Sequence, residues 1–245
     1  FTSECEPTDD SIMTIAVAKA ILSCNGNYSN LADQAIICMQ ELGRRYPYAG
    51  YGTHFAQWLG QPNPKPYNSY GNGSAMRVSP CAYAADTLEE AEALARAVTE
   101  VTHNHPEGIK GALATTAAIF MALHGSSITE IRDYINQKYY PMNFTLEEIR
   151  PNYRFDVSCQ GSVPQAIMAF LESTSFEDAI RNAISIGGDS DTIGAITGSI
   201  AEAYYGIPID IRNRATQYLD EFLIEILDHF EGKYGAVDDK AKGMN

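Results

Sequence analysis

The chain has 245 residues, of which 31 are acidic and 17 basic, and its formal net charge is −14 at pH 7. A field of that sign repels nucleic acid and anionic membranes, so we expect neither as a partner. The sequence contains no run of about 18 apolar residues, so we predict no membrane span. Its five cysteines lack a CxxC spacing, which indicates reduced thiols in a cytoplasmic protein.

Helical periodicity dominates the sequence. We expect the first two helices to follow Thr8 and Asn30 as N-caps, and a capping box of Thr87 and Glu90 to begin a later one. The Ala-rich helix at 110–123 is apolar on most sides, which favours a buried central position. The predicted helices cover residues 9–24, 30–45, 87–103, 110–123, 127–138, 162–172, 176–185, 191–204 and 211–229.

The segment between the second and third of these helices differs in composition. Residues 46–82 are rich in Gly, Pro, Tyr and Asn, and we predict one long loop there. Alternating strand patterns are scarce along the whole chain. The sequence therefore predicts an all-α fold, organised as a single compact domain over residues 1–245, with a frayed tail at residues 235–245.

Two short acidic motifs stand at expected helix N-termini. Taken alone, each is an N-cap with acids in the first turn, which the helix dipole favours by roughly 0.3–1 kcal/mol per acid. The second motif also follows a glycine pair that permits an unusual backbone, and it opens a helix whose small residues allow another element to approach closely. The motifs are Thr8-Asp9-Asp10 and Asp189-Ser190-Asp191-Thr192.

The two motifs offer the same chemistry, since each supplies two carboxylates and a threonine hydroxyl. If the two helix N-termini converge, four carboxylates meet and repel one another unless a cation binds or their pKa values shift. Ligands that are all oxygen favour a hard divalent ion, Mg²⁺, Mn²⁺ or Ca²⁺. The alternative is a structural helical protein in which these acids are only caps.

Two further motifs suggest an anion site. In SYGNGSAMR, Gly71 and Gly73 permit a backbone that turns several N–H groups toward one phosphate, although an ordinary Asn-Gly turn is the simpler interpretation. His103 lies near an expected helix C-terminus, which Pro106 would end, and is either a cap or a donor to phosphates. Nearby tyrosines either stack a purine or cover the core: Tyr46, Tyr48, Tyr51, Tyr67 and Tyr70.

The order of these motifs, TDD, GNGSAMR, THNHP and GGDSDTIGAITG, resembles the ADP-ribosylglycohydrolase family from Thr8 to about Pro208. That family includes the dinitrogenase-reductase-activating glycohydrolases and the ADP-ribosyl-acceptor hydrolases. The resemblance implies an orthogonal helical bundle with two divalent cations, Mg²⁺ or Mn²⁺. It also implies an enzyme that removes ADP-ribose from a modified protein side chain, with arginine the first expectation.

The resemblance also implies residue roles, carried over by matching position. The metal ligands would be Thr8, Asp9, Asp10, Asp189, Asp191 and Thr192, with Asp191 as the bridging ligand. Contacts to ADP-ribose would come from Ser69, Tyr70, Gly71, Asn72, Gly73 and His103. The cations would orient the ribose hydroxyls beside the scissile glycosidic carbon, where positioning and electrostatic stabilisation support departure of the acceptor.

One departure from the family pattern concerns catalysis. The family carries a GDxxGxxxE-like segment before TDD, and its glutamate acts in the reaction, whereas this sequence begins seven residues before Thr8. Glu4 and Glu6 do not occupy the motif position, so no catalytic residue is assigned. The alternative function is therefore an inactive ADP-ribose or nucleotide binder, and a partner or second copy is expected to cover the apolar surface left by the absent segment.

Overall fold

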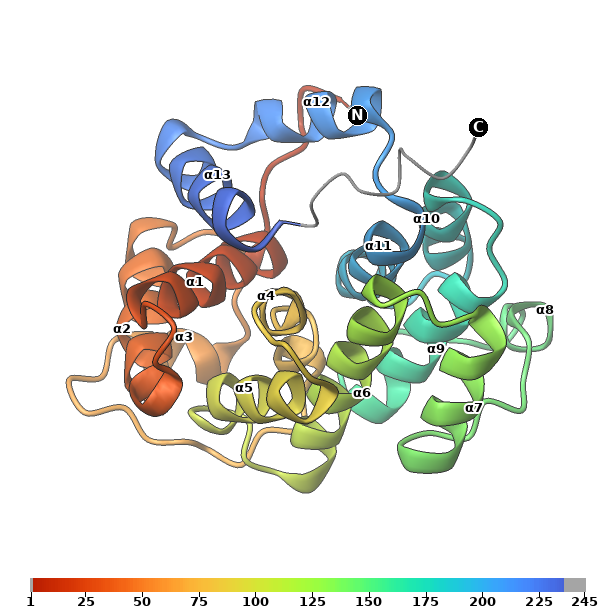
Figure 1. Cartoon of the computed structure of the whole chain (residues 1–245), viewed down its shortest axis with the longest axis horizontal. Helices are drawn as coiled ribbons and strands as arrows, with labels where there is room; N and C mark the ends of the chain where they lie inside the picture. The colour runs from red at the N-terminus through yellow and green to blue at the C-terminus, as the bar shows by residue number, and fades with distance from the viewer. Residues whose placement is uncertain (1, 236–245) are drawn as a thin grey trace.

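The computed structural model describes residues 2–235, and within that range it contains helices and no β-strand (Figure 1). The predicted all-α fold is confirmed. The α-helices are α1 (Asp9–Ser23), α2 (Leu31–Arg45), α3 (Thr53–Leu59), α4 (Ser79–Tyr83), α5 (Leu88–Glu100), α6 (Pro106–Leu123), α7 (Ile128–Lys138), α8 (Leu146–Ile149), α9 (Cys159–Leu171), α10 (Phe176–Ser185), α11 (Ser190–Tyr205), α12 (Ile209–Ala215) and α13 (Glu221–Tyr234). Three 3₁₀ turns accompany them: η1 (Tyr28–Asn30), η2 (Asn72–Ser74) and η3 (Thr216–Tyr218).

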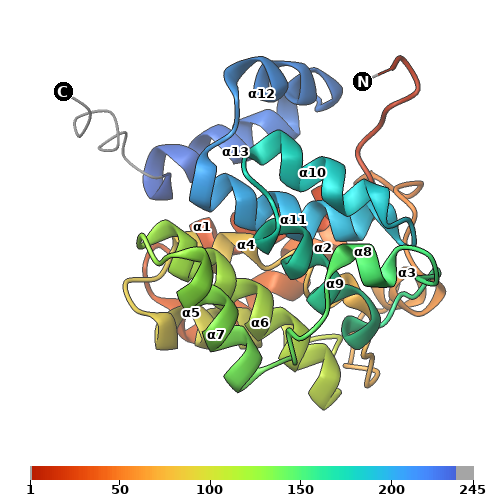
Figure 2. The same cartoon turned by 90° about the vertical axis from the view of Figure 1, so that its right-hand side faces the viewer.

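Two helices organise the packing. The Ala-rich α6 contacts α4, α5, α7, α9 and α11, which confirms the predicted buried central helix. The glycine- and alanine-bearing α11 contacts α1, α6, α9 and α10. Both views place α12 and α13 on one side of the molecule and α5, α6 and α7 on the other (Figures 1 and 2). Helices far apart in sequence, α1 and α11, are thereby brought into contact.

The prediction of one long loop over residues 46–82 is wrong. Two short helices, α3 and α4, and the turn η2 lie inside it. Helices of five and seven residues are too short to display a helical period in sequence. Tertiary packing holds them instead, because Phe55 and Trp58 of α3 and Cys81 of α4 are buried.

The single helix predicted at 211–229 is also wrong, since it divides into α12, η3 and α13. The side chain of Asp220 accepts a hydrogen bond from the backbone N–H of Leu223 at 3.0 Å, which caps a new helix start there. Pro106 likewise begins α6 instead of ending the helix before it. Its missing N–H costs nothing in the first turn of a helix.

The predicted caps are mixed. Thr8 and Asn30 stand at their expected positions but make no side-chain capping bond. Thr87 does accept from the N–H of Glu90, yet the carboxylate of Glu90 accepts from Asp86, so the box is only half formed. The expected tail at 235–245 lies, beyond Gly235, outside the described residues. No helix in the described range combines the length and apolarity that crossing a bilayer requires.

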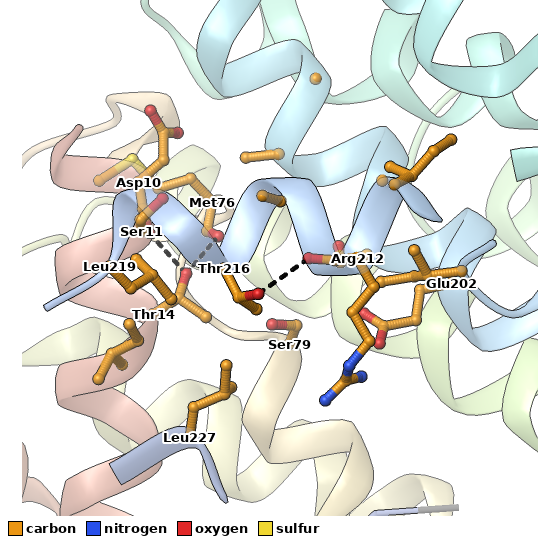
Figure 3. A pocket seen from close by; sticks show the side chains of 18 of the residues that line it. Asp10, Ser11, Thr14, Met76, Ser79, Glu202, Arg212, Thr216, Leu219 and Leu227 are labelled. Carbon is orange, nitrogen blue, oxygen red and sulfur yellow. Dashed lines mark hydrogen bonds between the residues drawn. The ribbon is translucent and has the colours of Figure 1, made fainter. Parts of the chain in front are cut away.

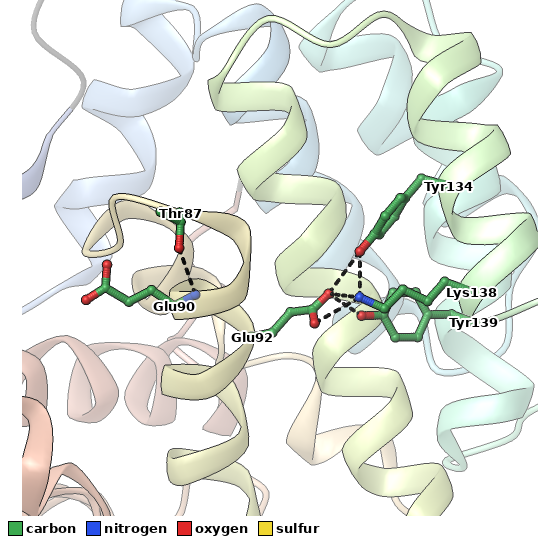
Figure 4. A network of polar contacts seen from close by, with 6 residues as sticks. All are labelled: Thr87, Glu90, Glu92, Tyr134, Lys138 and Tyr139. Carbon is green, nitrogen blue, oxygen red and sulfur yellow. Dashed lines mark hydrogen bonds and ion pairs between the residues drawn. The ribbon is translucent and has the colours of Figure 1, made fainter.

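Glu92 ties α5 to α7 through a polar network (Figure 4). Its carboxylate accepts from Lys138 at 2.8 and 3.0 Å and from the Tyr134 hydroxyl at 3.2 Å, and also from the hydroxyl of Tyr139. The Glu92 side chain is only 17% exposed. Hydrogen bonds to a charged acceptor count for more than neutral ones, so this carboxylate is the main polar link between the two helices.

Replacing Glu92 with alanine is therefore expected to lower the free energy of unfolding by about 1.5–3 kcal/mol, because it leaves three donors without their acceptor. Urea denaturation monitored by circular dichroism measures the change. The matched control is Glu89→Ala, which removes the same charge from an exposed position of the same helix. Equal effects of the two substitutions would show that the network does not stabilise the fold.

Candidate functional site

The structure brings the two acidic helix N-termini together. Asp10, in the first turn of α1, is 5% exposed, and its Oδ2 accepts from the Thr8 hydroxyl at 2.9 Å. Thr192, in the first turn of α11, is also 5% exposed and lies close enough to the carboxylates of Asp10 and Asp189 to oppose the rise of their pKa values. The two motifs thus share one site, although Asp10 and Asp189 lie 179 residues apart in the sequence.

The carboxyl groups at this site perturb one another. Burial raises the pKa of Asp9 to about 7, and repulsion from Asp10, Asp191 and Asp189 adds to the shift. Burial raises the pKa of Asp10 to about 6, although the hydrogen bond from Thr8 opposes it. Burial also raises the pKa of Asp189. Such a group of acids, with Asp10 buried and Asp9 and Asp189 half-buried, favours a bound cation or bound protons.

A glycine pair shapes the backbone that leads into α11. Gly187 and Gly188 both have positive φ angles, +74° and +75°, a region that side-chain-bearing residues rarely adopt. A Cβ atom on Gly188 would lie 2.3 Å from Cε1 of Tyr153, whereas one on Gly187 would meet nothing within 4 Å. The turn thus presses against Tyr153 just before Asp189.

Asn72 connects the glycine-rich loop to the acidic site. Its side-chain amide donates to Oδ2 of Asp189 at 2.6 Å and to the hydroxyl of Ser162 at 3.0 Å. Asn72 is itself buried. The predicted loop and the predicted acidic motif are therefore adjacent, and the amide of Asn72 serves to hold Asp189.

The backbone of this loop differs from the expected open anion nest. The N–H of Gly71 donates to the hydroxyl of Ser69 at 3.1 Å, and the N–H of Asn72 donates to the carbonyl of Val157 at 2.8 Å. These two N–H groups are already used within the protein. Gly71 also forms an isolated antiparallel bridge with Ser158, which pins the loop to the start of α9.

The imidazole of His103 faces the same loop. A Cβ atom on Gly73 would lie 3.5 Å from Nε2 of His103, and one on Gly71 would lie 3.6 Å away. His103 is 5% exposed, and burial lowers its pKa well below the ordinary value, with Arg77 adding to the effect. His103 is therefore a neutral group at the edge of the loop, beyond the end of α5.

The tyrosines near the loop have divergent positions. Tyr48 is 95% exposed and Tyr70 is 52% exposed, so neither covers the core. Tyr51 and Tyr67 pack partly against the core, and the Tyr67 ring lies 5.9 Å from that of His103 between centroids. Tyr70 contacts His105 with the two rings tilted by 58° and their centroids 5.2 Å apart. Of this group, Tyr70 combines exposure with a place in the glycine-rich loop.

The donors at the acidic site suit a hard cation. Among residues 2–235, no three Asp, Glu, His or Cys side chains form a ready-made metal-ligand group, and Asp191 is exposed. However, Oδ1 of Asp10 is buried and has no hydrogen-bond partner, a costly state for a carboxylate oxygen. The same site offers carboxylate and hydroxyl oxygens from two helix starts. A mixed set of this kind fits Mg²⁺ or Mn²⁺.

A cavity of about 380 Å³ lies along α11, and Asp10 is the one acidic-site residue that lines it (Figure 3). Asp10 lies toward one end, and Glu202 lies toward the other beside the ion pair of Arg212 and Glu231. Gly194 and Gly198 of α11 form part of the wall. Burial raises the pKa of Glu202 to about 7, Glu231 adds to the shift and Arg212 opposes it.

This shift predicts a pH dependence of stability. The carboxyl of Glu202 holds its proton more tightly in the folded chain, so its stabilising contribution is present below the unfolded pKa and is lost as pH rises toward 7. We expect Glu202→Gln to melt above the parent chain at pH 8 and level with it near pH 4. Thermal denaturation across this range measures the difference, and Glu225→Gln, on the exposed face of α13, is the control. A pH-independent difference would contradict the assignment.

Sequence reasoning missed Arg77 and Thr102, which lie behind His103 at this site. Arg77 is 1% exposed and donates to the hydroxyl of Thr102 at 2.7 Å, and that hydroxyl contacts Nδ1 of His103. Arg77 lies within the same SYGNGSAMR motif. A charged residue among the apolar residues of a predicted loop was the one available signal, because buried charges are rare unless they are paired.

Comparison with known proteins finds a family and several relatives that this chain resembles along most of its length. The model of the ADP-ribosylglycohydrolase family matches residues 2–236. Human ADP-ribosylhydrolase ARH3 is 28% identical, over 82% of this chain and 71% of the relative. The ADP-ribosyl-[dinitrogen reductase] glycohydrolase of Rhodospirillum rubrum is 24% identical, over 82% of this chain and 69% of its own. ADP-ribosylarginine hydrolase Tri1 of Pseudomonas putida (strain GB-1) is 28% identical, over 61% and 42%.

A solved structure shares the fold. The chain described as "ADP-ribosylglycohydrolase-related protein complex" superposes with a TM-score of 0.67 at 22% identity, over 94% of this chain and 82% of that chain. At this identity the match supports the helical architecture alone. The family likeness read from the four motifs is confirmed by the family model.

Proposed function

Because this chain belongs to the ADP-ribosylglycohydrolase family, we propose that it removes ADP-ribose from a modified protein side chain. The reaction is hydrolysis of the glycosidic bond that joins the ribose to its acceptor. Water supplies the hydroxyl that remains on the ribose and the proton that leaves with the acceptor. The relatives named above as ADP-ribosylhydrolase, ADP-ribosylarginine hydrolase and ADP-ribosyl-[dinitrogen reductase] glycohydrolase support this assignment.

The observation that carries the proposal is the meeting of two motifs at Asp10 and Thr192, with Asn72 joining Asp189 to the glycine-rich loop. This arrangement sets a cluster of acidic oxygens beside a loop next to a neutral histidine. A ribose bound between them would have its hydroxyls near the acids and its phosphates near the loop. Binding of ADP-ribose is thus assigned to Ser69, Tyr70, Gly71, Asn72, Gly73 and His103.

The proposed cofactors are two divalent cations, Mg²⁺ or Mn²⁺. When bound, such cations would orient ribose hydroxyls and stabilise charge at the reacting carbon. The chain's own contribution is to hold the oxygens in place. Thr8 orients Asp10, and Asn72 orients Asp189. The proposed ligands are Thr8, Asp9, Asp10, Asp189, Asp191 and Thr192.

The acceptor is proposed to be arginine. The printed name of the Pseudomonas putida relative, an ADP-ribosylarginine hydrolase, supports this choice. A protein carrying ADP-ribose on arginine and one carrying it on serine should therefore differ as substrates. We expect release from the first and little from the second.

The decisive experiment incubates the chain with each substrate in Mg²⁺, Mn²⁺ or chelator and quantifies free ADP-ribose. Calorimetry with ADP-ribose is run on the same samples. Metal-dependent release from the arginine substrate supports the whole proposal. Binding without release would replace it by the alternative, a non-hydrolysing ADP-ribose binder. Absence of both binding and release would overturn both functions.

A further inference from the structure

A buried chain of polar groups stands behind the glycine-rich loop. The guanidinium of Arg77 is fully enclosed, and its Nη2 donates to the hydroxyl of Thr102 at 2.7 Å and to the carbonyl of Val98 at 3.3 Å. The same hydroxyl lies 2.7 Å from Nδ1 of His103. The three side chains come from two segments, the loop before α4 and the end of α5, so the fold assembles the chain.

The direction of these hydrogen bonds follows from what each group can donate. Arg77 has donors and no acceptor, so Thr102 must accept from it. The hydroxyl of Thr102 then has one proton to give, either to Nδ1 of His103 at 2.7 Å or to the carbonyl of Thr99 at 3.4 Å. A hydroxyl proton aimed at Thr99 would make only a long contact, outside the usual range of about 2.5–3.0 Å for an O–H···O bond, whereas one aimed at Nδ1 makes a bond of good length. The positive charge on Arg77 also makes the hydroxyl a better donor, which favours the same direction.

A neutral imidazole that accepts at Nδ1 carries its proton on Nε2. His103 is neutral in this environment, because burial lowers its pKa well below the ordinary value. Nε2 is the atom that faces Gly71 and Gly73. Within the described residues, the hydrogen bond that the His103 ring makes is at its other nitrogen, Nδ1. The N–H at Nε2 therefore points at the loop.

We propose that Arg77 and Thr102 are positioning residues that hold His103 as the Nε2–H tautomer, so that it donates a hydrogen bond to an oxygen of the bound ligand at the Gly71–Gly73 loop. The ligand assignment, a diphosphate oxygen of ADP-ribose, rests on the proposed function. The tautomer does not, because it follows from contacts within the chain.

A donor held in this way has a chemical advantage for an oxygen anion. Two N–H groups of the loop are already used within the protein, so His103 supplies a donor that the backbone lacks. A neutral imidazole also donates without adding a charge to the buried Arg77 nearby. The small Gly71 and Gly73 leave room for the ligand oxygen, since a side chain there would occupy the space before Nε2.

The test is the ¹⁵N spectrum of chain labelled at histidine nitrogens, in which protonated and unprotonated ring nitrogens are resolved. The His103→Gln spectrum assigns the signals. We expect Nε2 protonated and Nδ1 unprotonated in the parent chain. Thr102→Val should produce a mixture of tautomers, and Thr102→Ser, which keeps the hydroxyl, should retain the parent spectrum.

Thr99→Val is the matched control. Thr99 is a buried threonine one turn earlier, and its hydroxyl has no hydrogen-bond partner. It should leave the tautomer unchanged. For ADP-ribose binding, we expect Thr102→Val to weaken the affinity about three- to tenfold, the size of one neutral hydrogen bond, and Thr102→Ser to restore it.

Three outcomes decide the matter. Nδ1 protonated in the parent chain, or a parent-like spectrum in Thr102→Val, overturns the proposal. If Thr102→Val does not fold, the parent spectrum and Thr102→Ser still decide it. A chain that keeps the Thr102-dependent Nε2–H tautomer but binds no ADP-ribose would support the relay and overturn the proposed ligand, so the two failures are distinguishable.

Discussion

Asp10→Asn is expected to lower metal-dependent release of ADP-ribose at least about 100-fold, because it removes a charged oxygen from the proposed cation site, and metal-ion stabilisation of developing charge is worth several kcal/mol. Asparagine has nearly the same shape, and its oxygen is still able to accept from Thr8. The fold should therefore survive. Calorimetric titration measures the expected loss of Mn²⁺ affinity, and the release assay measures the expected loss of ADP-ribose release.

The same substitution should change stability in the opposite direction in chelator. Burial raises the pKa of Asp10 to about 6, so the folded chain is penalised as pH rises through that value, and the penalty disappears with the acid. Asp10→Asn should thus melt above the parent at pH 8 and level with it near pH 4. Asp33→Asn, on the exposed side of α2, supplies the control.

These two readouts separate a metal ligand from a helix cap. If Asp10 were only an N-terminal acid, asparagine would weaken the helix slightly at neutral pH and leave Mn²⁺ binding unchanged. Unchanged release in Asp10→Asn would contradict the proposed ligand set. Loss of release without any loss of Mn²⁺ affinity would also contradict it, because the acid would then act in another way.

Gly188→Ala is expected to disrupt the site through the backbone. Gly188 has φ of +75°, and a Cβ there would lie 2.3 Å from Cε1 of Tyr153. Alanine at this positive φ costs about 1–2 kcal/mol of backbone strain. Its Cβ atom also displaces the ring of Tyr153 or the turn that carries Asp189. We expect a lower free energy of unfolding in urea. We also expect the rate of ADP-ribose release to fall by more than the smaller folded fraction explains.

Gly187→Ala is the matched control, since it has the same positive φ but open space around its Cβ position. Gly187→Ala should lower the free energy of unfolding by the backbone strain alone. If the two variants behave alike, contact with Tyr153 does not matter to the site. A double variant with Tyr153→Ala should recover part of the loss in Gly188→Ala, because the clash is removed.

Several helix starts could be predicted from the residues next to them in the sequence. The run at 176–185 matches α10, and α11 begins at Ser190, one residue before the predicted start. The Thr87 cap is correct because a hydroxyl one position before a helix acts on its own first turn. The glycine pair before Asp189 also signals an unusual backbone on sequence alone, since few other residues tolerate positive φ.

Longer-range features needed the fold. Residues 46–82 have the composition of a loop, whereas the burial of Phe55 and Trp58 against the rest of the fold holds α3 in place. The break between α12 and α13 depends on Asp220 capping a new helix, which helical periodicity along the sequence does not reveal. Arg77 in a loop motif gave no hint of its partner, because Thr102 lies 25 residues away.

The sequence by itself determined that the chain is helical, which residue types stand at the two acidic helix N-termini, and that their order matches a family. Those properties depend on side chains close along the chain, where periodicity, caps and glycine φ act. Only the tertiary structure decided that Asp10 meets Thr192, that Asn72 holds Asp189, and that Arg77 and Thr102 orient His103. Those contacts join residues far apart in the chain, and packing of α1 against α11 and of the loop against the end of α5 sets them.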